Sequence, residues 1–112
     1  LCGMHHGLAN ALCLVAGMNF CARRKPGIYR RVGIACGLDL AKVTDGEADC
    51  ATVGFVSQFL ANLGLNTKLR EHGVKPELLE ALVAQAVDDP CHRTNAVPVN
   101  AADFRALYLE VL

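Results

Sequence analysis

The stretch HHGLANALCLVAGMNF, residues 5–20, decides the fold class, because its apolar residues recur with the period of an α-helix. This run is too short to cross a bilayer, which needs about 20 apolar residues, and asparagines interrupt it. It therefore predicts a buried helix that opens on two adjacent histidines, His5 and His6. The residues expected on its inward face are Leu8, Ala11, Leu12, Val15 and Met18.

The rest of the chain continues in helical periods, and we find no convincing strand, internal repeat or linker. Proline and glycine in RRKPG, residues 23–27, end the first helix. Further helices are expected to begin near Pro26, Thr44, Pro76 and Asn100, whereas glycines at positions 37, 64 and 73 end helical segments. The sequence predicts a single all-α domain over residues 1–112, a bundle of about five helices.

The third expected helix has the most regular amphipathic pattern in the chain. We expect Asp45, Glu47 and Asp49 to form a solvated first turn, where the helix dipole favours negative charge. The residues expected to face inward are Ala48, Thr52, Phe55, Val56, Phe59, Leu60 and Leu63.

Composition excludes several classes of function. Eleven basic and eleven acidic residues give a net charge of zero, and aromatics make up 5% with no tryptophan. Nothing here indicates a nucleic-acid partner or an anionic membrane surface. The six cysteines include no CxxC pair, which favours reduced structural thiols and a cytoplasmic location.

Few residues suggest chemistry on their own. Adjacent helical residues diverge by about 100°, so at most one of His5 and His6 is expected to bind an ion. Cys2 and His5 form a C-x2-H half-site, which leaves a small zinc-binding protein as an alternative. The loop DDPCHRTN, residues 88–95, places Cys91 and His92 among other polar residues, either for function or simply as turn chemistry. No glycine-rich nucleotide motif occurs.

Four segments, in order along the chain, resemble the iron-containing (group III) alcohol dehydrogenases. The segment HHGLANALCLVAGMNF resembles the family's H-G helix opening, and YRRVGIACGL, residues 29–38, resembles its Y-x-x-I-A-x-x-L-G segment. Residues 59–89 and 88–112 are similar to its L-G-L-P and closing D-x-C-H-x-x-N-P-R-P segments. The chain departs from the family pattern at Ala16, Asn66, Ala96 and Val97, which affects loop conformation more than fold.

The resemblance implies that this chain has the fold of the C-terminal domain of the dehydroquinate synthase-like, iron-dependent alcohol dehydrogenases. Such an enzyme has an N-terminal α/β domain that binds NAD(P), transfers hydride between an alcohol or aldehyde substrate and that cofactor, and can form a homodimer. The resemblance implies that the chain is the later part of the helical domain and is inactive alone, and the start at Leu1 without an initiator methionine agrees with this expectation.

In that family one aspartate and three histidines hold a divalent ion, usually Fe²⁺ and sometimes Zn²⁺. The resemblance assigns His6 as the last of these ligands and gives His5 no ligand role. It places Cys91 and His92 on a loop at the substrate side of the cleft. The competing hypothesis is a free-standing helical interaction or scaffold domain without catalysis.

Overall fold

The computed structural model describes residues 2–112. Over this range the chain is a flattened molecule of 45 × 30 × 18 Å that contains helices and no strand. This confirms the predicted all-α class and the bundle of about five helices. The α-helices are α1 (His6–Arg24), α2 (Arg30–Ala35), α3 (Asp45–Asn62), α4 (Leu79–Asp88) and α5 (Ala101–Val111). Short 3₁₀ helices occupy η1 (Leu69–His72), η2 (Pro76–Leu78) and η3 (Pro90–Thr94).

Helices α3 and α5 each begin with a capping box, at the residues where the sequence predicts a helix start. The Thr44 hydroxyl accepts a hydrogen bond from the backbone N–H of Glu47 at 3.3 Å, and the Glu47 carboxylate accepts from the backbone N–H of Thr44 at 2.8 Å. The backbone N–H and the hydroxyl of Thr44 both donate to the Glu47 carboxylate, and these two hydrogen bonds lower the pKa of Glu47. Asn100 and Asp103 repeat the arrangement at the start of α5, which confirms Asn100 as the N-cap.

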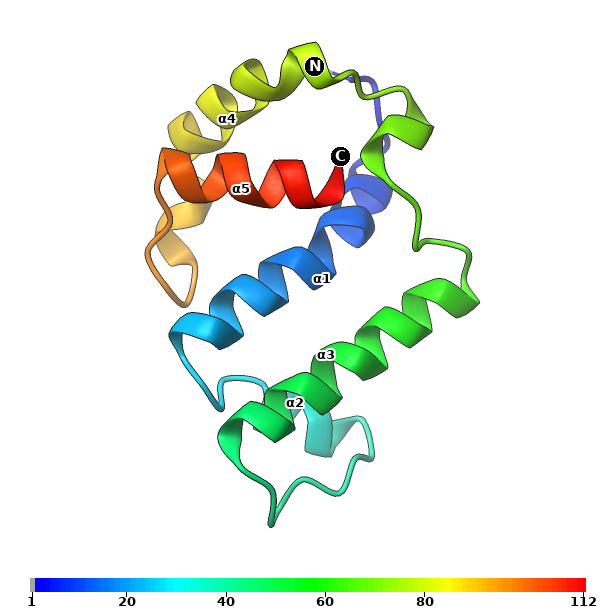
Figure 1. Ribbon diagram of the computed structural model, residues 1–112, viewed down its shortest axis with the longest axis vertical. Coiled ribbons are helices and arrows are strands. Elements are labelled where there is room, and N and C mark those ends of the chain that lie inside the picture. Colours follow the sequence, from blue (N-terminus) through cyan, green and yellow to red (C-terminus); the bar gives the residue numbers. More distant parts are fainter. Residues whose placement is uncertain (1) are drawn as a thin grey trace.

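Helix α1 crosses the middle of the molecule, with α3 on one flank and α5 on the other (Figure 1). Helix α4 packs against α5, and α2 packs against α3. Leu12 and Ala16 of α1 belong to one buried cluster, and Phe20 and Cys21 belong to a second. The buried residues that meet them come from other segments: Leu69, Val74 and Val111 in the first cluster, and Val97 in the second.

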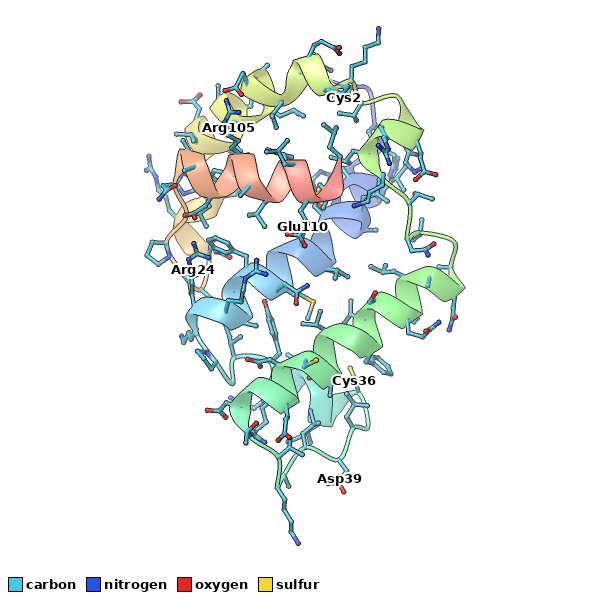
Figure 2. The ribbon with its side chains drawn as sticks, in the orientation of Figure 1. Cys2, Arg24, Cys36, Asp39, Arg105 and Glu110 are labelled. Atoms are coloured by element: carbon cyan, nitrogen blue, oxygen red, sulfur yellow. The ribbon has the colours of Figure 1, made fainter. Side chains whose placement is uncertain are left out.

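Ion pairs tie α5 to its two neighbours (Figure 2). Arg24 at the end of α1 pairs with Asp103 at 2.8 Å, and its guanidinium lies 3.7 Å from the centre of the Phe20 ring. Arg105 of α5 pairs with Glu80 of α4. The long central helix is therefore fixed to α5 at its carboxyl end.

The prediction that Asp49 lies in a solvated first turn is wrong, because Asp49 is buried. Its two carboxylate oxygens accept hydrogen bonds from the backbone N–H groups of Gly27 at 2.7 Å and Tyr29 at 2.9 Å. The connection between α1 and α2 has backbone donors that no helix satisfies, and a carboxylate meets that need. Asp49 thus fastens this connection to α3.

The inward face of α3 also differs from the prediction. Phe55, Phe59 and Leu63 are exposed, whereas the buried residues of α3 are Ala48, Asp49, Thr52, Val53 and Leu60. The physical reason is the close contact with α2, where Gly33 lies against the Thr52 side chain. This contact and the Asp49 carboxylate rotate α3 so that its small residues face inward.

None of the helices described for residues 2–112 combines the length and the apolarity that a bilayer crossing requires.

Candidate functional site

The two histidines at the start of α1 have different local roles. His5 is the N-cap residue, and its Nδ1 accepts a hydrogen bond from the backbone N–H of Gly7 at 3.3 Å. His6 is the first residue of the helix and is exposed. The capping bond engages one ring nitrogen of His5.

Asn10 lies one helical turn after His6. Its side-chain nitrogen is 3.2 Å from Nε2 of His6, within hydrogen-bonding distance. Asn10 also lines a groove of about 820 Å³ that runs along α1. Seven residues of α1 line this groove, and all but Met18 lie on the helical stripe that continues from His6: Asn10, Cys13, Leu14, Gly17, Met18, Phe20 and Cys21.

The loop that carries Cys91 forms another wall of this groove. Asp89 precedes η3, and its carboxylate accepts a hydrogen bond from the backbone N–H of Cys91 at 2.8 Å. These contacts lower the pKa of Asp89, whereas the hydrogen bond to Asp89 and its negative charge raise the pKa of the Cys91 thiol. Cys91 is exposed and protonated, so it is better suited to contacting a ligand than to attacking one.

His92 is half-buried in the same loop. Its Nε2 lies 3.1 Å from the backbone carbonyl of Val87. Because a carbonyl can only accept, Nε2 carries the proton and a neutral ring leaves Nδ1 as the acceptor. The ring also stands edge-on to Phe104, with 5.8 Å between the ring centres. These contacts hold His92 in one orientation against the groove.

Two tyrosines complete the groove from other segments. Burial, and after it the nearby Cys21, raise the pKa of Tyr29 to about 12. Burial likewise raises the pKa of Tyr108. Both hydroxyls therefore remain protonated and neutral near pH 7.

The groove includes Cys91 and His92 but leaves them far from His6. The side chain of Cys21 contacts Asn95 of this loop at 3.7 Å, and Cys21 is about 22 Å from His6 at the helical rise of 1.5 Å per residue. Within residues 2–112 no three or more histidine, cysteine, aspartate or glutamate side chains gather in a way that could hold an ion. An ion bound at His6 would therefore need donors from outside the described residues.

Asn10 and the two tyrosines were not singled out as site residues from the sequence. Asn10 could have been found, because it lies four residues after His6 and such pairs are neighbours on a helix. Tyr29 and Tyr108 reach the groove through tertiary packing, for which the sequence carries no local signal.

Comparison with known proteins gives consistent results. The family model for the C-terminal part of the Fe-containing alcohol dehydrogenase family matches residues 1–112. The 4-hydroxybutyrate dehydrogenase of Cupriavidus necator is 35% identical over 105 residues, which cover 94% of this chain and 26% of that protein. The lactaldehyde reductase of Escherichia coli (strain K12) is 31% identical over 103 residues, which cover 92% of this chain and 27% of that protein.

The fold matches a crystal structure of a 1,3-propanediol oxidoreductase with a TM-score of 0.92 at 20% identity. The match covers 100% of this chain and 29% of that one. The chain therefore spans about a quarter of the length of the curated relatives that it matches.

Proposed function

This chain belongs to the Fe-containing alcohol dehydrogenase family, and from that membership we propose that it is the metal-binding helical part of a metal-dependent alcohol dehydrogenase. The proposed enzyme transfers hydride between a small alcohol or aldehyde and NAD(P), and residues 1–112 form one domain that works with an N-terminal nucleotide-binding domain. The free thiols of all six cysteines are in keeping with a cytoplasmic enzyme.

One observation carries this proposal: His6 stands exposed at the first turn of α1, in line with a groove that also contains the Cys91 loop. A neutral imidazole suits Fe²⁺ and Zn²⁺ alike. Since the described residues provide this donor and no complete cluster, the remaining ligands belong to the rest of the polypeptide.

A divalent ion held by His6 and by ligands from the rest of the polypeptide would supply Lewis-acid chemistry to the alcohol oxygen, and NAD(P) would carry the hydride. The residues of this chain hold and shape the site. His5 caps α1 and fixes the first turn from which His6 projects. His92 and Cys91 lie on the groove wall, and the family resemblance is what places their loop toward the substrate.

The test is the metal content and turnover of His6→Ala in the complete enzyme. His5→Asn is the matched control, because asparagine is a good N-cap residue and keeps the capping acceptor. We expect His6→Ala to lose its metal and its activity and His5→Asn to keep both. Retained metal with near-normal turnover in His6→Ala would remove His6 from the site.

A further inference from the structure

The loop that carries Cys91 and His92 buries little of its own surface. Within residues 90–95 every residue is exposed except His92, which is half-buried. The position of this loop on the groove wall therefore depends on a small number of polar and ring contacts. The contacts of His92 with Val87 and Phe104 hold its first part against α4 and α5.

Asn95 holds the last part of the loop. Its side-chain nitrogen donates a hydrogen bond to the backbone carbonyl of Val97 at 2.9 Å. Because a carbonyl can only accept, the amide oxygen is the atom that faces the thiol of Cys21, at 3.7 Å. The backbone N–H of Asn95 donates to the carbonyl of His92 at 3.1 Å. Asn95 thus joins the turn that contains His92 to α1.

Both partners of the Asn95 side chain are buried. Cys21 and Val97 are each 6% exposed, and both belong to the cluster that contains Phe20. Residues in a packed cluster have little freedom to move, so they are fixed points for the loop. Asn95 itself is exposed and lines the groove. Its amide therefore serves to fasten the loop to these two points and not to fill the core.

We propose that Asn95 is a positioning residue, whose contacts with Cys21 and Val97 fix the loop in place and thereby set the affinity of the enzyme for its alcohol. This inference rests on the proposed function, in which the loop faces the substrate. Cys21 lies near the carboxyl end of α1, whereas His6 lies at its amino end. The loop therefore meets a part of the substrate away from the ion, so Asn95 affects alcohol binding and not metal binding.

The experiment is a double-mutant cycle on the complete enzyme with its metal and NAD(P). Steady-state constants are measured with the primary alcohol, from ethanol to 1-hexanol, that the wild-type enzyme oxidises most efficiently. We expect Asn95→Ala to raise the KM for that alcohol roughly 3- to 10-fold, the range that corresponds to about one hydrogen bond. The values of kcat, the KM for NAD(P) and the metal content should stay unchanged, because the lost contact affects the ground state and the transition state equally.

Cys21 provides the other corner of the cycle. Cys21→Ala removes the thiol that faces the Asn95 amide and should raise the KM for the same alcohol. The double variant should bind the alcohol no worse than Asn95→Ala alone, because the two residues act through one contact. The matched controls are Asn62→Ala and Cys50→Ala, since both residues are exposed on α3. Neither control should change the KM.

An unchanged alcohol KM in Asn95→Ala overturns the inference. An effect that Cys21→Ala does not share overturns it too, since Asn95 then contacts the substrate itself, and so does loss of metal or of kcat without a change in KM. If Asn95→Ala does not fold, the KM of Cys21→Ala decides the question. Metal and turnover in the wild-type enzyme test the proposed function separately, because they are independent of the KM values of the variants.

Discussion

At the scale of single residues, Asp49 shows how one carboxylate can fix a connection between helices. It is only 4% exposed, and its two oxygens accept from separate backbone N–H groups, those of Gly27 and Tyr29. Thr52, one turn later, donates to the Ala48 carbonyl at 2.8 Å, so the neighbouring polar group is satisfied within the helix. The α1–α2 connection depends on Asp49 alone for these two bonds.

We therefore expect Asp49→Ala to destabilise the protein by roughly 2–4 kcal/mol, since it leaves two backbone donors without their acceptor. Urea unfolding monitored by circular dichroism measures the change in free energy of unfolding. Asp39→Ala, at an exposed loop position, is the control and should change stability by less than about 0.5 kcal/mol. Equal effects of the two substitutions would contradict the role assigned to Asp49.

The sequence could not reveal this role. An acidic residue in the first turns of a helix normally faces water and the helix dipole, and Asp49 satisfies that local rule as well as Asp45 or Glu47 does. Its partners lie 20 and 22 positions earlier in the chain. Only the folded position of the α1–α2 connection distinguishes Asp49 from its neighbours.

At the scale of elements, the helix ends were predictable because they depend on nearby residues. Thr44 with Glu47 and Asn100 with Asp103 form the capping boxes that their spacing indicates. The rotation of α3 was not predictable. Apolar residues occur on several sides of this helix, so the choice between burying Phe55 and burying Val53 depends on its packing against α1 and α2.

The contact between α2 and α3 gives a prediction at Gly33. A Cβ atom there would collide with the Thr52 hydroxyl and with a methyl group of Leu40. We expect Gly33→Ala to destabilise the protein by about 1–3 kcal/mol, as overpacking does, although helix propensity alone would favour alanine. Thermal unfolding is the measurement, with Gly46→Ala as the uncrowded comparison. Stabilisation by Gly33→Ala would show that the two helices do not approach this closely.

At the scale of the whole molecule, the site is only partly predictable from the sequence. The resemblance identified His6 and the loop of Cys91 and His92 as candidates. The groove that contains the loop and lies in line with His6 brings together α1, η3 and α5, and no local pattern shows that these elements meet. The incomplete set of metal donors, by contrast, follows from the resemblance itself, which assigns only His6 of the family's four ligands to this chain.

This incompleteness predicts how the 112-residue chain behaves by itself. With His6 as the proposed donor and no cluster of three among the described residues, the isolated chain should retain far less than one Fe²⁺ or Zn²⁺ ion after dialysis. Elemental analysis of the dialysed chain is the measurement. One tightly bound zinc per chain would instead support a site built on Cys2 and His5.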